Sequence, residues 1–243
     1  MTELVAVIQA RMGSSRLPGK VLLSLAGETV LARVVRAARS SGGLDEVVVA
    51  TSGDPRDDPV ADECARIGAL CVRGSEDDVL SRFVDALDAY PSEAVMRLTA
   101  DCPLLDPEIV RTAADMWQAS PAVDYLSTAL VRTLPRGLDV EIVRSDVLRT
   151  VNKVATGHDR VHVTSWVYAH PDDFRIIGMD FLPNRDHLRL TLDTAEDWAL
   201  VQRVVETFGL RQPPLDELAA WLDANPDVRE LNAEVAQKRL DEG

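Results

Sequence analysis

The stretch LVAVIQARMGSSRLPGK, from Leu4 to Lys20, decides the fold. It opens with Leu4–Ile8, a continuous apolar run rich in β-branched residues, which is typical of a strand buried on both faces of a parallel sheet. Gly, Ser and Pro then interrupt residues 13–19. Further on, Thr29 is a suitable N-cap for apolar residues that recur at helical spacing. The sequence therefore predicts a strand, a loop and a helix.

The same alternation continues through the first half of the chain. Strands are predicted at Glu46–Ala50, Leu70–Arg73 and Ala94–Leu98, and helices at Val60–Ile67 and Val79–Tyr90. Alternation of this kind indicates a parallel sheet whose strands are joined by crossover helices.

The regular alternation of predicted strands and helices ends at about residue 120. We predict a small mixed α/β lobe inserted at about 130–180, followed by a helical C-terminal segment at about 209–243, within one domain that spans 1–243. The predicted strands in this half are Asp124–Ser127, Leu138–Ile142, Phe174–Met179 and Leu188–Thr191, and the predicted helices are Ala195–Phe208 and Leu215–Leu222.

Composition excludes several classes of protein. The 243 residues carry 26 Lys+Arg against 40 Asp+Glu, a net charge of −14, so a general attraction to nucleic acid phosphates is not expected. The cysteines Cys64, Cys71 and Cys102 have no zinc spacing and suggest a reducing compartment. No signal segment and no apolar run of about 20 residues is present, which predicts a cytoplasmic protein without a membrane contact.

The loop after the first strand is the main candidate for chemistry. It combines cations, glycines and hydroxyls, namely Arg11, Arg16, Lys20, Gly13, Gly19, Ser14 and Ser15. Ligands bind beyond the carboxyl ends of parallel strands, and this set suits a polyphosphate. It is not a Walker A loop, because five residues separate Gly13 from Gly19 and Val21 follows Lys20. A solvated basic turn is the alternative.

The sequence of this loop and its flanks, IQARMGSSRLPGKVL, resembles the N-terminal signature of the cytidylyltransferases that activate acidic sugars. These are the acylneuraminate and 3-deoxy-manno-octulosonate (Kdo) cytidylyltransferases. The nearest branch resembles the spore coat polysaccharide biosynthesis proteins of the SpsF type. Five further segments match in order: Arg73–Phe83, Arg97–Pro107, Leu134–Ile142, His162–Pro171 and His187–Trp198. The resemblance implies an α/β fold with a Rossmann-like, mostly parallel sheet of the nucleotide-diphospho-sugar transferase type.

The resemblance also implies an activity. CMP would pass from CTP to a small acidic acceptor, either a sugar acid such as a nonulosonate or Kdo-like acid or a phosphonate, with release of pyrophosphate. Lys20, Arg11 and Asp101 would be catalytic. Asp101 and Asp193 would bind Mg²⁺ or Mn²⁺, and each follows a predicted strand, as a metal–triphosphate site requires. The alternative for Asp193 is a helix N-cap shared with Thr194.

Two groups of binding residues follow from the same match. The nucleotide would contact Ala10, Arg11, Met12, Gly13, Ser14, Arg16, Lys20, Thr51, Ser52, Arg73, Ser75, Thr99 and Ala100. The acceptor would contact Arg136, Asp139, Glu141, His162 and Arg189, with Arg132, Arg185 and His187 nearby. Taken singly, most of the second group could equally be surface arginines or core histidines.

The resemblance further implies a homodimer in which the lobe reaches the partner subunit. The stretch Val163–Tyr168 would supply that contact or would form an internal helix face. Two positions depart from the branch, which usually has glutamate where Val161 stands and glycine where Ala100 stands. Two other functions stay open: a UTP-, GTP- or dTTP-dependent sugar-1-phosphate nucleotidyltransferase, and a nucleotide-binding protein without turnover.

Overall fold

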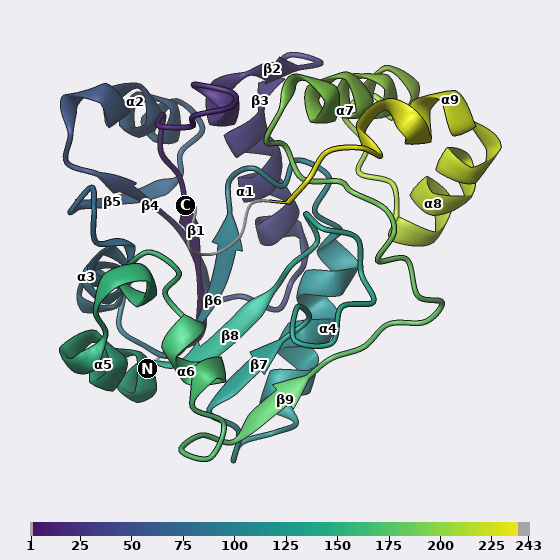
Figure 1. Cartoon of the computed structure of the whole chain (residues 1–243). Helices are drawn as coiled ribbons and strands as arrows, with labels where there is room; N and C mark the ends of the chain where they lie inside the picture. Colours follow the sequence, from purple (N-terminus) through teal and green to yellow (C-terminus); the bar gives the residue numbers. More distant parts are fainter. Residues whose placement is uncertain (1, 238–243) are drawn as a thin grey trace.

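The computed structural model describes residues 2–237 of the chain. Its centre is a sheet in the order β5-β4-β1-β6-β8-β7-β9 (Figure 1). The first strand, β1 (Thr2–Gln9), pairs in parallel with β4 (Glu46–Ser52) on one side and with β6 (Ser92–Thr99) on the other. β5 (Leu70–Gly74) continues the parallel half beyond β4. The predicted mostly parallel sheet is confirmed.

The second half of the chain extends the same sheet. β8 (Glu141–Arg144) runs antiparallel to both β6 and β7 (Tyr125–Ser127), and β9 (Ile176–Gly178) pairs in parallel with β7. The mixed pairing expected after residue 120 therefore lies at one edge of a single seven-stranded sheet. A separate short hairpin joins β2 (Ser24–Leu25) to β3 (Glu28–Thr29).

Alternate side chains of β1 enter two cores. Leu4, Ala6 and Ile8 point into a core on one face, whereas Val5 and Val7 point into the core on the other. This two-sided burial explains why the strand reads as a continuous apolar run. The first core is covered by α1 (Val30–Ser40), α2 (Asp58–Arg66), α4 (Pro107–Gln118), α7 (Ala195–Phe208) and α8 (Leu215–Ala224). The second is covered by α3 (Val79–Ala89), α5 (Ser145–Val154) and α6 (Ser165–Ala169).

Local signals explain where several helices begin. The hydroxyl of Thr29 accepts a hydrogen bond from the amide of Ala32 at 3.0 Å, so the predicted N-cap of α1 is confirmed. Asp106 caps α4 in the same way, accepting from the amide of Glu108 at 2.9 Å. Helices α4 and α5 were not predicted from the sequence, although the pair Asp106–Pro107 before an amphipathic run is a usable signal for α4. The short helix α9 (Pro226–Arg229) follows α8.

Two predicted strands differ from the structure. The strand predicted at Leu138–Ile142 begins only at Glu141, because Gly137 has φ +102° and the chain is still turning there. The stretch Leu188–Thr191 is not a strand; it makes one isolated bridge, between Arg136 and Arg189. Its backbone bonds go to two separate segments, so no ladder can form.

The stretch Val163–Tyr168 belongs to the interior. Val163 and Val167 are fully buried and pack in the second core with α3 and α5. The internal reading of this stretch is therefore the one the structure supports, and the dimer contact assigned to it is wrong for these two valines.

Candidate active site

The loop after β1 folds back on itself and directs Lys20 toward the centre of the molecule. The amide of Met12 donates to Asp57 Oδ1 at 2.6 Å, and its carbonyl accepts from the amide of Gly19 at 3.0 Å. Gly19 has φ +69°, a conformation that side chains rarely adopt, and a 3-10 turn, Lys20–Leu22, begins directly after it. The glycine thus permits the reversal that positions Lys20.

Lys20 lies between two carboxylates. Its Nζ donates to Asp101 Oδ2 at 2.6 Å and to Asp193 Oδ1 at 2.7 Å. Burial lowers the pKa of Lys20, but the charges of Asp101 and Asp193 outweigh it and the net pKa is raised. Lys20 is therefore held as a cation where Asp101, just after β6, and Asp193, just before α7, converge.

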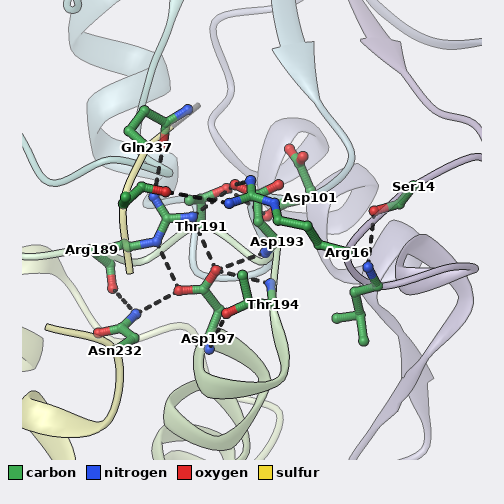
Figure 2. A network of polar contacts seen from close by, with 12 residues as sticks. Ser14, Arg16, Asp101, Arg189, Thr191, Asp193, Thr194, Asp197, Asn232 and Gln237 are labelled. Carbon is green, nitrogen blue, oxygen red and sulfur yellow. Dashed lines mark hydrogen bonds and ion pairs between the residues drawn. The ribbon is translucent and has the colours of Figure 1, made fainter. Parts of the chain in front are cut away.

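Asp193 is fixed from several sides (Figure 2). Its Oδ2 pairs with Arg16 at 3.1 Å and with Arg189 at 2.8 Å. Burial raises the pKa of Asp193, and the neighbouring cations, Lys20 first, lower it below the ordinary value. The next helix is capped by Thr194 and Asp197 in a capping box. The N-cap alternative for the Asp193 side chain is therefore excluded.

A close backbone approach brings Asp193 to Asp101. The amide of Leu190 donates to the carbonyl of Arg136 at 2.7 Å, and the amide of Leu192 donates to the carbonyl of Asp101 at 2.8 Å. A Cβ on Gly137 would lie 2.6 Å from the carbonyl carbon of Leu190, so only glycine allows this approach. The motif Leu134–Ile142 thus has a structural role in assembling the site.

A cavity of about 630 Å³ opens beside Lys20, and we name it the nucleotide cavity. It is lined by Gln9, Ala10, Arg11, Gly13, Ser14, Ser15, Arg16, Lys20, Val21, Val79, Arg82, Thr99, Ala100, Asp101, Val161 and Asp193. Most of the predicted nucleotide-binding residues are present. Arg82 and Gln9 were not predicted, although Arg82 lies inside the matched motif Arg73–Phe83, which was the available signal.

Five predicted nucleotide contacts are not part of this wall. Thr51 and Ser52 are fully buried, and the Ser52 hydroxyl donates to Asp57, so these side chains cannot reach a ligand. Arg73 binds the carbonyls of Ser52 and Asp54 and the carboxylate of Asp58. Ser75 accepts from the amide of Asp78, and Met12 packs against the core. The strand ends at Thr51 and Arg73 support the loop instead of lining the cavity.

A second cavity, of about 740 Å³, is also lined by Asp101 and Asp193, and we name it the acceptor cavity. It contains four of the predicted acceptor residues, Arg136, Asp139, Glu141 and His162. The two cavities share Gln9, Arg16, Thr99, Asp101 and Asp193. Whatever binds in one cavity therefore meets what binds in the other at the Lys20–Asp101–Asp193 cluster.

Most charges in the acceptor cavity are already paired. Glu141 accepts from Arg97, Tyr125 and Thr164. Burial raises the pKa of Glu141, and Arg97 together with the two hydroxyls lowers it below the usual value. Asp139 accepts from Arg132 at 2.8 Å. Glu141 is therefore held in place by three donors at the wall of the cavity, and its contact with the acceptor stays a prediction.

Arg136 differs from these paired charges. Within the described part of the chain, no hydrogen bond or ion pair is made by its guanidinium. Burial, followed by the charge of Arg132, lowers the pKa of Arg136. Arg189 is fully engaged with Asp193, Asp197 and Gln237 and does not line this cavity. Arg185 pairs with Asp216.

Asp101 and Asp193 can bind a divalent cation only when phosphate oxygens supply further ligands to it. Among residues 2–237, no group of three or more acidic, His or Cys side chains is arranged to hold a metal. Asp101 and Asp193 nevertheless converge on one cation, Lys20, and Mg²⁺ takes few carboxylates and keeps phosphate and water ligands. The donor set therefore fits a metal that arrives with a triphosphate. In the same described range, no helix is long and apolar enough to cross a membrane.

Comparison with known proteins agrees with this geometry. The cytidylyltransferase family model matches residues 5–242. The spore coat polysaccharide biosynthesis protein SpsF of Bacillus subtilis is 34% identical, over 94% of this chain and 97% of its own length. A 3-deoxy-manno-octulosonate cytidylyltransferase of Maricaulis maris is 34% identical over 53% of this chain and 49% of its own length. The solved structure of a cytidylyltransferase from Leptospira borgpetersenii superposes with a TM-score of 0.91 at 27% identity, covering 98% of this chain and 100% of that one. The chain therefore belongs to the cytidylyltransferase family and is a nucleotidyltransferase.

Proposed function

We propose that this enzyme transfers CMP from CTP to a small acidic acceptor and releases pyrophosphate. One observation carries the proposal: two cavities of different character share a wall at Asp101 and Asp193, with Lys20 between them. A nucleotide in the first cavity and an acceptor in the second would meet there. The family match and the relative named as a Kdo cytidylyltransferase support CTP as the nucleotide.

The residues have separable roles. Arg11, Ser14, Arg16 and Lys20 bind the phosphates, and the backbone at Gly13 approaches them closely. An oxygen of the acceptor attacks the α-phosphorus, the bond from that phosphorus to the bridging oxygen breaks, and pyrophosphate leaves. Lys20 neutralises charge on the phosphate oxygens as the bond breaks.

Asp101 and Asp193 would hold Mg²⁺ or Mn²⁺ together with the triphosphate, and the metal would supply charge neutralisation at the reacting phosphate. Asp101→Asn removes one ligand and is expected to raise the Mg²⁺ concentration for half-maximal activity by at least about tenfold. Asp115→Asn, at an exposed position on α4, serves as the control. An unchanged Mg²⁺ dependence in Asp101→Asn contradicts the metal role.

The acceptor is expected to carry a carboxylate or a phosphonate. Arg136 faces the acceptor cavity with an uncommitted guanidinium, and Arg–carboxylate and Arg–phosphate contacts are strong and often bidentate. Sugar acids and phosphonates share this anionic chemistry.

A turnover screen tests the function. The enzyme is incubated with Mg²⁺, each of CTP, UTP, GTP and ATP, and either a sugar acid, a phosphonate or a sugar 1-phosphate. Pyrophosphate release and the mass of the product are measured. Formation of a CMP conjugate with an acid supports the proposal, and the acceptor that reacts shows whether the substrate is a sugar acid or a phosphonate. Turnover restricted to a sugar 1-phosphate with another triphosphate contradicts it.

We also propose a homodimer formed at the β9 edge. β9 is the outer strand of the sheet, and Gly178 at its end lies against Leu130 and Val131, which are 39% and 54% exposed. An open strand edge beside exposed apolar side chains favours association. Light scattering at micromolar concentration measures the mass, and a monomer contradicts the proposal.

A further inference from the structure

Asp193 is held by three cations, of which two face the nucleotide cavity. Lys20 donates to its Oδ1 at 2.7 Å, and Arg16 and Arg189 pair with its Oδ2 at 3.1 Å and 2.8 Å. Lys20 and Arg16 line the nucleotide cavity, and the proposed function assigns both to the phosphates. A bound triphosphate competes with Asp193 for these two cations, because phosphate oxygens are equally strong acceptors. Arg189 is then the cation that continues to hold Asp193.

Arg189 is fixed from behind by a second carboxylate. Its Nε and Nη2 donate to the two oxygens of Asp197 at 2.8 Å and 3.0 Å, and Nη2 also donates to Asp193 at 2.8 Å (Figure 2). Asp197 is fully buried, and its Oδ2 accepts from the amides of Asp193 and Thr194 at 2.9 Å and 3.1 Å. A bidentate arginine–carboxylate pair fixes the plane of the guanidinium. Asp197 therefore determines the direction in which Arg189 reaches Asp193.

Asn232, near the C-terminal end of the described chain, completes this network. It lies in the 3-10 turn Glu230–Asn232 and is 3% exposed. Its Nδ2 donates to Asp197 Oδ1 at 2.8 Å and to the carbonyl of Arg189 at 3.0 Å (Figure 2). One buried amide group thus ties the backbone of Arg189 to the carboxylate that its side chain binds.

The same C-terminal stretch supplies a second contact. The amide of Val235 donates to the carbonyl of Asn232 at 3.1 Å, and Gln237 Oε1 then accepts from Arg189 Nη1 at 2.8 Å. All three nitrogens of the Arg189 guanidinium therefore have a partner. The sequence beyond residue 209 carries none of the matched motifs, yet two of its side chains hold this arginine.

We propose that Asn232 is a positioning residue, which acts through Asp197 and Arg189 to hold Asp193 in the orientation that binds the metal of a metal–triphosphate complex. The assignment rests on the proposed function, in particular on the metal role of Asp193. Asn232 lines neither the nucleotide cavity nor the acceptor cavity, so its influence on the metal passes through its neighbours. Residues that hydrogen-bond behind a metal ligand commonly change metal affinity 10- to 100-fold when they are replaced.

Calorimetric titration of CTP over a series of Mg²⁺ concentrations, and in EDTA, tests this role without an acceptor. Asn232→Leu keeps the approximate size of the side chain and removes both donated hydrogen bonds. It is expected to raise the Mg²⁺ concentration that half-maximally tightens CTP binding, the Mg²⁺ midpoint, by about tenfold. The affinity for CTP in EDTA is expected to stay that of the wild type, because only the metal ligand is disturbed.

Asn225 provides a matched control in the same part of the chain. Its Nδ2 donates to the carbonyl of Trp221 at 2.7 Å, within the α8–α9 segment. Asn225→Leu is expected to lower Tm and to leave the Mg²⁺ midpoint unchanged. For Asn232→Leu, a lowered Tm with an unchanged Mg²⁺ midpoint shows a purely structural role and overturns the proposal. A loss of CTP affinity that is equal in Mg²⁺ and in EDTA overturns it as well.

A second variant covers the case in which Asn232→Leu fails to fold. Asn232→Ala also lacks both donors but adds no bulk to the buried site, and it is expected to raise the Mg²⁺ midpoint in the same direction. An unchanged midpoint in folded Asn232→Ala overturns the positioning role. Gln237→Leu, at an exposed position, removes only the contact with Nη1 of Arg189 and is expected to shift the midpoint less.

The wild type separates a failure of the proposed function from a failure of this assignment. If Mg²⁺ tightens the binding of UTP, GTP or ATP but not of CTP, the proposed nucleotide is wrong. The same variants are then titrated with the nucleotide that binds, and the expected shift at Asn232 is unchanged. If Mg²⁺ tightens none of the four triphosphates, the metal role of Asp193 is overturned and the positioning role of Asn232 with it.

Discussion

The two cavities that meet at Asp101 and Asp193 are built from different kinds of chain segment. The nucleotide cavity takes much of its wall from the continuous stretch 9–21, with additions from the ends of neighbouring strands. The acceptor cavity collects side chains from segments spread between residues 97 and 237 in addition to Gln9 and Arg16. The first is therefore specified locally, and the second depends on how segments far apart in the sequence pack together at the edge of the sheet.

The cavities also differ in how their charges are used. In the acceptor cavity, Arg97 pairs with Glu141 and Arg132 pairs with Asp139, which leaves Arg136 uncommitted among the described residues. In the nucleotide cavity, Nε and Nη1 of Arg82 are buried without a hydrogen-bond partner. Selectivity in each cavity is therefore expected to depend on one or two unpaired groups.

The largest effect is expected at the shared wall. Lys20→Ala removes the cation between Asp101 and Asp193 and is expected to lower kcat by at least about 10³-fold while the protein stays folded. Pyrophosphate release measures the rate, and circular dichroism checks the fold. Lys153→Ala, at an exposed position on α5, is the control. Wild-type turnover in Lys20→Ala would show that the loop carrying Lys20 has no role in catalysis.

A large effect on stability is expected at the floor of the acceptor cavity. Glu141→Gln leaves Arg97 as an uncompensated buried charge, which costs about 3–5 kcal/mol and lowers Tm by roughly 10 °C. Glu206→Gln, which breaks only an exposed pair with Arg203, is expected to change stability by less than about 1 kcal/mol. Equal Tm values for both variants would contradict the structural role of Glu141.

The same residue predicts a pH dependence. The pKa of Glu141 is lowered below 4.5 in the folded state, so its ionised form stabilises the fold at pH above the ordinary value. That contribution is lost as the pH falls below 4.5 and through the folded-state pKa. The Tm difference between wild type and Glu141→Gln is therefore expected to shrink in acid. A difference that stays constant down to pH 2 would argue against this ion pair.

A smaller effect, on KM for the acceptor, is expected to distinguish Arg136 from Arg132. Arg136→Met is expected to raise KM for the acceptor by roughly tenfold or more, with KM for CTP unchanged. Arg132→Met is expected to raise it less, because Arg132 is already paired with Asp139. Steady-state kinetics with each substrate varied in turn measure both. A larger effect at Arg132 would overturn the argument from pairing.

Much of the fold and the centre of the site could be predicted from local sequence. The apolar run of β1 and the loop to Lys20 form one short segment, and carboxylates after strands predicted Asp101 and Asp193. The structure brings all three together. Their catalytic and metal roles remain predictions that the variants above test.

The rest depended on tertiary packing. Arg82 falls on a helix whose pattern does not tell a buried arginine from an exposed one. Thr51 and Ser52 end a strand, as expected, but their side chains point into the interior. Leu188–Thr191 has the composition of a strand, yet its amides bond to the carbonyls of Arg185 and Arg136 in different segments. None of these outcomes is encoded within a few residues.

Thermal unfolding with CTP, UTP, GTP and ATP, each with Mg²⁺ and each with EDTA, tests whether Lys20, Asp101 and Asp193 form a metal-dependent CTP site. A ligand at about 100 times its Kd adds about 2.7 kcal/mol, which for this chain length corresponds to a Tm rise of roughly 5–10 °C. The largest rise in Tm is expected with CTP, and that rise is expected to be lost in EDTA. A larger rise with another triphosphate, or a rise with CTP that EDTA leaves unchanged, would contradict a metal-assisted CTP site at Lys20, Asp101 and Asp193.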